Sequence, residues 1–215
     1  MNDLTILYYS SNREKPEFEK MVTDSILRIV GDTPIISITH KPMDFGTNIC
    51  VGDVGLSDYN IYRQMQIGCL AAKTKYVCTA EADCFYPPTG YFDFKPPKDW
   101  TAGHYCNMYI LWKGSHIFHQ KAFSLCALYS NRKFLLSRFK RSIDDVEWRP
   151  DFKPAHPLFH KWKEWTPFKD FIPVINCKTG DGMRIKTGVG TEGAPQRELP
   201  YWGKATDMED KLWRI

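Results

Sequence analysis

The chain has 215 residues, which is enough for one α/β domain with a sizeable core. A hydrophobic fraction of 43% and a charged fraction of 25% are typical of a globular protein, and 14% aromatic residues argue against disorder along most of the chain. No apolar run reaches the length of a membrane span, and the net charge of +4 permits a polyanionic partner without requiring one.

The N-terminal residues lack the basic region and the small-residue cleavage site of a signal peptide, so we expect a cytoplasmic location. Seven cysteines are present and none forms a C-x-x-C pair. This spacing disfavours a zinc ribbon or a disulfide framework and predicts buried free thiols.

The first part of the chain alternates strand and helix patterns. Residues 4–9 form a compact apolar run that predicts a strand, and residues 16–30 have helical spacing from Pro16 up to Gly31. Residues 34–39 predict a second strand, parallel to the first. Residues 42–57 contain glycines and little periodicity, so we expect a long functional loop.

A helix and a strand follow this loop. Ser57 can cap a helix over residues 58–72, whose face of apolar and small residues, including Gly68, can lie close on a sheet. Residues 76–80 predict a third strand, which ends directly in Glu81-Ala82-Asp83.

The second part of the chain is less regular. Residues 107–112 predict a strand, and residues 121–139 predict a helix that becomes basic at its end. Residues 148–173 look irregular with short helices, residues 173–176 predict a short strand, and residues 178–203 predict a glycine-rich loop.

The acidic motif is the main chemical signal. Glu81 and Asp83 lie at the carboxyl end of a predicted parallel strand, where open α/β sheets bind their ligands. Two carboxylates on this exit turn can bind one divalent cation such as Mg²⁺ or Mn²⁺, which would neutralise a diphosphate leaving group. The first strand is followed by Ser10-Ser11-Asn12-Arg13, whose hydroxyl groups and guanidinium also favour an anion.

With these motifs, residues 4–90 resemble the GT-A glycosyltransferases, especially small bacterial and phage-type members related to the family-two enzymes. The resemblance implies a polar loop after the first strand, a helix with an Arg-Asn or Arg-Gln pair, and an Asp-x-Asp motif. The first acid here is Glu81 instead of Asp, which makes Asp83 the more secure metal ligand. The implied donor-binding residues are Ser10, Ser11, Asn12, Arg13, Arg63, Gln64, Glu81 and Asp83.

The resemblance also implies the fold and the reaction. We expect one GT-A domain over residues 1–215, with a Rossmann-like, mostly parallel central sheet and helices on both faces. Residues 1–100 would bind the nucleotide sugar and residues 101–215 the acceptor. The implied activity is a hexosyltransferase-type reaction (EC 2.4) that uses Mn²⁺ or Mg²⁺ and moves a sugar from a donor, favoured to be a UDP-sugar, to an acceptor hydroxyl.

The other catalytic groups are less specific in the sequence. An inverting enzyme needs a carboxylate base, and Asp144 and Asp145 follow the acidic motif at the expected place in the chain, with Glu147 and Glu164 as competitors. A third metal ligand can come from one of three histidines, which are His104, His156 and His160.

The acceptor and the reaction class leave alternatives open. Residues 131–141 and 152–165 interleave cations with aromatic residues, which suits a nucleic acid as well as a core-facing aromatic set. The phage-type resemblance suggests 5-hydroxymethylpyrimidine in DNA as the acceptor. A nucleotidyltransferase and a non-enzymatic nucleic-acid-binding protein are the competing interpretations. The sequence specifies neither the nucleobase, the sugar, the stereochemical outcome nor the oligomeric state.

Overall fold

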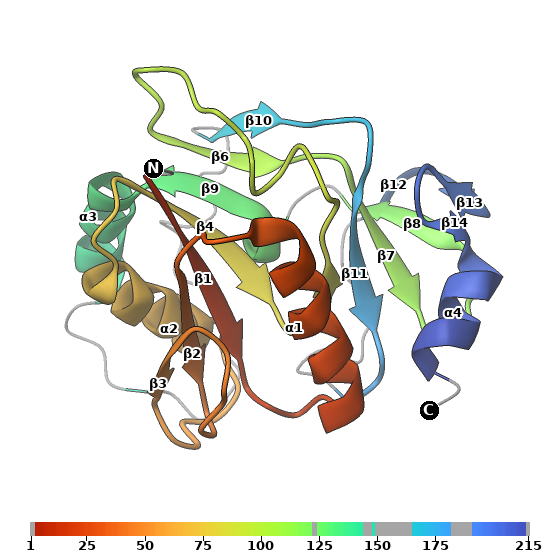
Figure 1. Ribbon diagram of the computed structural model, residues 1–215, viewed down its shortest axis with the longest axis horizontal. Helices are drawn as coiled ribbons and strands as arrows, with labels where there is room; N and C mark the ends of the chain where they lie inside the picture. Colours follow the sequence, from red (N-terminus) through yellow and green to blue (C-terminus); the bar gives the residue numbers. More distant parts are fainter. Residues whose placement is uncertain (1–2, 122–123, 144–147, 149–164, 182–190, 214–215) are drawn as a thin grey trace.

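In the computed structural model, which describes residues 3–121, 124–143, 148, 165–181 and 191–213, the core is a seven-stranded sheet of order β10-β6-β9-β4-β1-β2-β3 (Figure 1). Every neighbouring pair in it is parallel except the two pairs that β9 makes. The strands are β1 (Leu4–Ser10), β2 (Ile35–Thr39), β3 (Thr47–Cys50), β4 (Tyr76–Glu81), β6 (Ala102–Tyr105), β9 (Leu128–Asn131) and β10 (Thr166–Phe168).

A second sheet has the order β12-β8-β7-β11-β5. Its strands are β5 (Cys84–Phe85), β7 (Met108–Trp112), β8 (Phe118–Lys121), β11 (Val174–Lys178) and β12 (Thr191–Gln196). The short hairpin of β13 (Glu198–Leu199) and β14 (Gly203–Lys204) lies beside it. β5 follows β4 after two residues and pairs with β11, so the chain passes from one sheet to the other at the acidic motif.

Helices cover both faces of the central sheet. α1 (Pro16–Val30) lies between β1 and β11 in the view of Figure 1 and packs Val22 and Ile26 into the same cluster as Ile6 and Tyr8. α2 (Asp58–Ala71) and α3 (Arg132–Ser142) cover the other face, while α4 (Ala205–Trp213) lies beside the second sheet. The α/β class, the mostly parallel sheet and the helices on both faces are therefore as predicted.

Local sequence explains where α1 and α2 begin and end. Pro16 occupies the start of α1, where its missing N–H costs nothing, and Gly31 follows the last turn with φ 55°. The Ser57 hydroxyl accepts the Asn60 N–H at the start of α2. A Cβ built on Gly68 would lie 2.7 Å from Ile38 Cδ1 and 3.0 Å from Leu7 Cδ2, so the predicted close approach of α2 to the sheet is present.

Three predicted elements differ from the structure. The helix predicted over residues 121–139 was wrong in its first half, because residues 128–131 form β9, which is held between β4 and β6, and only Arg132 begins the helix. The loop predicted over residues 42–57 contains β3, whose parallel pairing with β2 supplies the backbone partners that the sequence did not reveal. The loop predicted over residues 178–203 contains β12 and β13, which pair with strands far from it or after it in the chain.

Two simpler predictions also have outcomes. All seven cysteines lie in the described part of the chain and are free thiols, as expected, but the predicted burial holds for five of them, since Cys50 is exposed and Cys106 is partly exposed. Among the described residues, none of the helices is both long enough and apolar enough to cross a bilayer.

The packing of α2 gives a first test. We expect Gly68→Val to lower the free energy of unfolding by about 1–3 kcal/mol, because its side chain must displace Ile38 and Leu7 in the core. Urea titration followed by circular dichroism measures the change. Leu70→Val on the same helix is the control, since Leu70 is 64% exposed. A loss no larger than that of the control would contradict the close packing.

Candidate functional site

The functional site that the sequence predicts lies at the carboxyl edge of the central sheet. β4, β1 and β2 are parallel neighbours, with Tyr9 opposite Glu81 and Ser10 opposite Thr39. The residues that follow these three strands therefore meet at one edge, as expected for a ligand crevice in an open α/β sheet.

Glu81 and Asp83 lie in a turn that other side chains hold in place. Glu81 is the last residue of β4, and its backbone N–H donates to the Tyr86 hydroxyl at 2.9 Å. The same hydroxyl donates to the Cys126 carbonyl at 2.8 Å, and Tyr86 is buried. The Cys177 N–H donates to the Asp83 carbonyl at 2.7 Å, which fixes the turn to β11.

Each oxygen of the Asp83 carboxylate accepts a hydrogen bond from a side chain of β11. Lys178 Nζ lies 2.6 Å from Asp83 Oδ2, and Asn176 Nδ2 lies 2.6 Å from Oδ1. The Lys178 and Asp83 side chains are only 14% and 11% exposed, so this ion pair is largely shielded from water. A pair so shielded is held by geometry and hydrogen bonds, since desolvation costs much of the Coulombic gain.

A second buried ammonium group lies behind this pair. Lys121 Nζ donates to Asn176 Oδ1 at 3.0 Å and to Ser124 Oγ at 2.9 Å. Asn176 is fully buried and joins Lys121 to Asp83 through the two ends of its amide. Two lysines and two acids therefore share one polar cluster between the two sheets.

The charges in this cluster shift one another. Burial and then the charge of Asp83 together raise the pKa of Glu81 to about 8, against the opposing charges of Lys178 and Lys121. Burial by itself would lower the pKa of Lys178, but the charges of Asp83 and Glu81 outweigh it and the net shift is upward. At neutral pH, Lys178 is therefore charged and Glu81 is largely protonated.

Two thiols adjoin Glu81. Ligand atoms of Glu81, Cys84 and Cys126 lie within 4.8 Å of one another and could hold a metal ion. Burial raises the pKa of Cys84 well above its usual range. Burial also acts to raise the pKa of Cys126, but the hydrogen bond with Cys84 and the charge of Lys121 lower it to about 7.

This donor set does not fit the Mn²⁺ or Mg²⁺ that the sequence predicts at Glu81 and Asp83. These hard cations prefer several oxygen ligands, whereas the described grouping offers one carboxylate and two sulfur atoms, which suit softer metals. Both oxygens of Asp83 already accept hydrogen bonds, and one of them contacts an ammonium group. The described residues therefore offer a metal grouping of a different chemical kind from the predicted one.

The polar loop after β1 is placed at the predicted edge, but its side chains have mixed roles. The Asn12 Oδ1 accepts the Lys41 N–H at 2.8 Å, and its Nδ2 lies 3.4 Å from a Glu19 oxygen, so this amide ties the loop to β2 and α1. The Ser10 hydroxyl accepts the Asn12 N–H at 2.8 Å. Arg13 is exposed and Ser11 is partly exposed at the same edge, so they are the members of the loop better placed for a ligand.

The predicted pair on α2 is also divided between roles. Gln64 is buried, and its Nε2 donates to the Ser10 carbonyl at 3.1 Å and to the Ile38 carbonyl at 2.8 Å. Gln64 therefore joins the carboxyl ends of β1 and β2 and has a structural role at this edge of the sheet. Arg63 is partly exposed and donates to Gln66 on the same helix.

Glu14 is a neighbour of the site that the sequence did not single out. It is buried, and its Oε2 accepts the Thr179 hydroxyl at 2.6 Å, directly after Lys178. Burial raises its pKa to about 7, opposed by this hydrogen bond and supported by the charge of Asp83. A second carboxyl group with a raised pKa therefore lies near the Asp83–Lys178 pair.

The remaining predicted site residues fall into two groups. The predicted bases Asp144 and Asp145, their competitors Glu147 and Glu164, and the histidines His156 and His160 lie outside the described residues. His104 is described, on β6, but the metal grouping among the described residues contains no histidine.

Sequence reasoning missed the residues that surround Asp83 because they come from distant parts of the chain. Asn176 and Lys178 lie more than ninety positions after Asp83, and Lys121 reaches them from β8. The only local signal was the short predicted strand at residues 173–176, whose continuation carries the lysine.

Comparisons with known proteins were made at the levels of sequence and structure. No protein-family model matches the chain, and no curated protein matches it. The glycosyltransferase GlyE of Streptococcus pneumoniae TIGR4 is similar with a TM-score of 0.45 and 10% identity, over 77% of this chain and 45% of GlyE, so the chain spans less than half of that protein.

Two further solved structures are similar. A glycosyltransferase involved in the glycosylation of the major capsid of PBCV-1 has a TM-score of 0.42 and 9% identity, over 78% of this chain and 81% of its own. A protein described as a nucleotide-diphospho-sugar transferase from Desulfovibrio desulfuricans G20 has a TM-score of 0.40 and 10% identity, over 85% of this chain and 84% of its own. These proteins are of the class that the sequence resemblance names, but at this distance none carries its activity over to this chain.

The raised pKa of Glu14 predicts a pH dependence of stability. The folded state binds the Glu14 proton more tightly than the unfolded state does, so this group's contribution is most favourable below about pH 4.5 and is lost as the pH rises to about 7. Glu14→Gln keeps the acceptor for Thr179 and removes the titration. Between about pH 4.5 and pH 7, we expect the free energy of unfolding of the variant to rise relative to that of the wild type by up to roughly 3 kcal/mol.

Urea unfolding at several pH values measures this gain, with Glu17→Gln, at an exposed site on α1, as the control. Parallel stability curves for the wild type and Glu14→Gln would show that Glu14 is not desolvated as described.

Proposed function

We propose that this protein is a glycosyltransferase that moves a sugar from a nucleotide-diphosphate sugar to an acceptor hydroxyl. The observation that supports this most directly is the polar cluster of Glu81, Asp83 and Lys178 at the carboxyl edge of parallel strands. Such an edge is where open α/β sheets bind nucleotides, and a charged cluster there can act on a diphosphate. We keep a UDP-sugar as the first donor to test.

The proposal divides the chain as the sequence suggested. Residues 1–100 contain the β1 loop, α2 and the acidic motif and would bind the donor, while residues 101–215 would bind the acceptor. Lys121, Asn176 and Lys178 come from the second part and reach the donor edge, so this proposed division is not a strict one. Asp144 and Asp145 stay the predicted bases that take the acceptor proton.

In the proposed reaction Glu81 binds hydroxyl groups of the donor. Its carboxyl group is partly buried beside Asp83 and Lys178, and a carboxylate accepts hydrogen bonds from ribose or sugar hydroxyls. A divalent cation bound by Glu81 and Asp83, as predicted from sequence, would require Asp83 to release Lys178 and Asn176. We therefore assign no step of the reaction to a metal.

A screen of nucleotide sugars tests the reaction class. We expect saturable release of one nucleoside diphosphate from one donor. Release of pyrophosphate from nucleoside triphosphates would instead indicate a nucleotidyltransferase, and no turnover of any nucleotide would leave a non-enzymatic binding protein. The screen is run with and without Mn²⁺ and Mg²⁺, so that a metal requirement does not hide the activity.

Glu81→Gln tests the site within this screen. Glutamine resembles the protonated glutamate that burial favours, so we expect the variant to keep its melting temperature. Above about pH 8, where Glu81 is ionised, we expect kcat/KM for the donor to fall about 10- to 100-fold, as for loss of a hydrogen bond to a charged group, whereas near pH 6 it should change little. Turnover by the wild type should rise with pH towards about 8 as Glu81 ionises, and the variant should lack this rise. Glu17→Gln serves as the control, and unchanged turnover in Glu81→Gln would remove Glu81 from the site.

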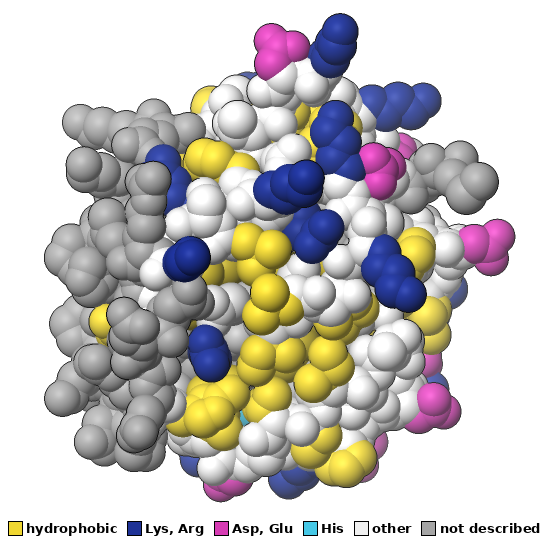
Figure 2. All heavy atoms as spheres, turned by 90° about the vertical axis from the view of Figure 1, so that its left-hand side faces the viewer, with side chains coloured by type: hydrophobic (Ala, Val, Ile, Leu, Met, Phe, Trp, Pro, Cys, Tyr) yellow, Lys and Arg dark blue, Asp and Glu magenta, His cyan; other side chains and the backbone are white. Residues whose placement is uncertain are grey.

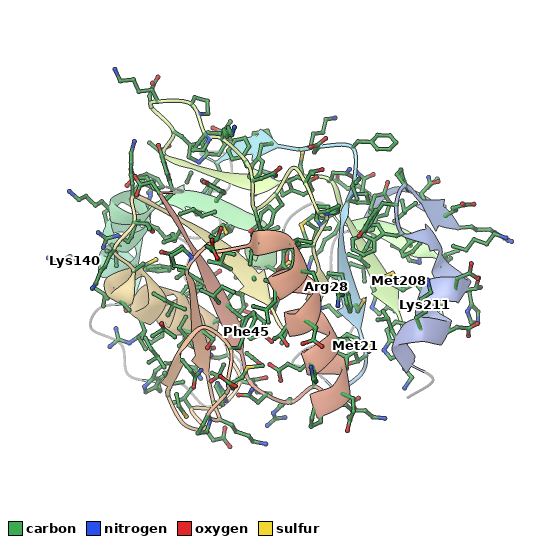
Figure 3. All side chains as sticks on the ribbon, in the orientation of Figure 1. Met21, Arg28, Phe45, Lys140, Met208 and Lys211 are labelled. Carbon is green, nitrogen blue, oxygen red and sulfur yellow. The ribbon has the colours of Figure 1, made fainter. Side chains whose placement is uncertain are left out.

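For the acceptor we retain 5-hydroxymethylpyrimidine in DNA as a proposal. Figure 2 shows the side of the molecule on which α3 lies in Figure 1. Lys and Arg side chains gather in its upper half, above a band of hydrophobic side chains. Lys133 and Lys140 of α3 are exposed, and Lys140 points away from the sheet in Figure 3. Arg132 instead donates to the Thr74 carbonyl at 2.9 Å, so it serves the fold.

Lys133→Glu/Lys140→Glu tests whether α3 contacts DNA. If hydroxymethylated DNA is the acceptor, we expect sugar transfer to DNA to weaken and its salt dependence to decrease. The variant makes fewer contacts with phosphates, so fewer counterions are released when DNA binds. Donor hydrolysis without acceptor should stay at the wild-type rate. Transfer to a glycan, together with inactivity on hydroxymethylated and unmodified duplexes, would exclude DNA as the acceptor.

A further inference from the structure

The Asp83–Lys178 pair occupies the place where the sequence predicts a divalent cation. Lys178 Nζ contacts Asp83 Oδ2 at 2.6 Å, while Asn176 occupies the other carboxylate oxygen. The carboxylate therefore already holds a positive charge at the end of β4. The Lys178 side chain keeps 14% of its surface exposed, so this side chain is not sealed in the core.

The backbone around Lys178 is fixed on both sides. Its carbonyl accepts the Lys113 N–H at 3.1 Å, and the preceding Cys177 N–H donates to the Asp83 carbonyl. The next residue, Thr179, donates to Glu14 at 2.6 Å. An ammonium group held in this way is preorganised for an anion, which is the condition for strong electrostatic stabilisation of a leaving group.

The charge of the cluster also favours an anion. Lys121 and Lys178 contribute two positive charges, and Asp83 contributes one negative charge. Lys178 pairs with Asp83, whereas Lys121 donates to two neutral groups, the Ser124 hydroxyl and the Asn176 amide oxygen. Among these contacts the Lys121 ammonium group is not paired with a carboxylate, which favours an anion at this site.

We infer that Lys178, oriented by Asp83, binds the diphosphate of the donor in place of a divalent cation, so that donor binding and sugar transfer proceed without added metal. This inference rests on the proposed function. In the transfer, the bond from the anomeric carbon to the β-phosphate oxygen breaks and both electrons stay on that oxygen. The acceptor oxygen bonds to the same carbon and its proton passes to a carboxylate base, while Lys178 donates a hydrogen bond to the departing diphosphate.

Calorimetric titration of UDP, GDP and ADP in excess EDTA tests the inference directly. We expect the wild type to bind one of them, and Lys178→Met to bind it about 10- to 100-fold more weakly, as for loss of a charge-assisted hydrogen bond. Lys178→Arg should retain most of the EDTA-resistant binding. Lys20→Met is the matched control, since Lys20 pairs with Asp24 at 2.7 Å on the exposed face of α1.

Metal rescue provides a second readout. Lys178→Ala frees Asp83 Oδ2 and leaves room beside it, so we expect Mn²⁺ to restore part of the diphosphate binding in this variant and to change the wild type little. If a single variant fails to fold, Lys178→Met/Asp83→Asn removes both charges together, so that no unpaired carboxylate is buried. This double variant should bind the diphosphate weakly both in EDTA and in Mn²⁺.

The outcomes separate this inference from the proposed function. Wild-type binding and sugar transfer that both require Mn²⁺ or Mg²⁺ would overturn the role of Lys178 and leave the glycosyltransferase proposal intact. Undiminished binding in Lys178→Met would overturn it as well. Diphosphate binding in EDTA without turnover of any nucleotide sugar would support Lys178 and remove the glycosyltransferase, whereas no binding of any diphosphate would overturn both.

Discussion

The arrangement of this protein depends on a buried ion pair between Asp83 and Lys178. Asp83 follows the central β4, and Lys178 ends β11 in the second sheet, so the pair joins the two sheets. A carboxylate shielded from water needs a partner of opposite charge, since an uncompensated buried charge would cost several kcal/mol, on the order of 3–5. The turn after β4 and the end of β11 are therefore constrained to meet.

Buried hydroxyl and amide groups complete this junction. Asn176 satisfies Asp83 and Lys121 together, and the Tyr86 hydroxyl bridges the Glu81 N–H and the Cys126 carbonyl. Nearby, the Tyr91 hydroxyl donates to the Thr79 carbonyl at 2.7 Å. Each of these side chains is large or polar and nearly inaccessible, so it stabilises the fold only because its polar atoms have partners. The same network places Lys178 and Glu81 at the carboxyl edge of the parallel strands.

One polar atom near this network has a different status. The Tyr9 hydroxyl is buried and lacks a hydrogen-bond partner among the described residues, while Tyr9 lies opposite Glu81 in the parallel register. The charge of Glu81 contributes, after burial, to raising the pKa of Tyr9. An unsatisfied buried hydroxyl costs about 1–3 kcal/mol, and few such groups occur in native structures.

The sequence by itself determined the elements that local pattern controls. A few neighbouring residues determine the apolar run of β1, the limits of α1 at a proline and a glycine, and the face of α2 that is lined by small residues. The acidic motif was also correctly placed at the end of a parallel strand. The role of a polar side chain was harder to predict from sequence. Asn12 and Gln64 suit a ligand site as well as they suit the structural role of joining strand ends that they have here.

Only the tertiary structure decided which partners Asp83 has. β9 and β12 are stabilised by pairing with strands far away in the chain, and β3 by pairing with the strand before it, so their short sequences carried no clear periodicity. Lys121, Asn176 and Lys178 are likewise unremarkable in sequence, since the charge and hydrogen bonds that define them arise when β8 and β11 meet the turn after β4. The sequence therefore determined where the acidic site would lie, and the long-range packing of two sheets decided that its carboxylate would face a lysine.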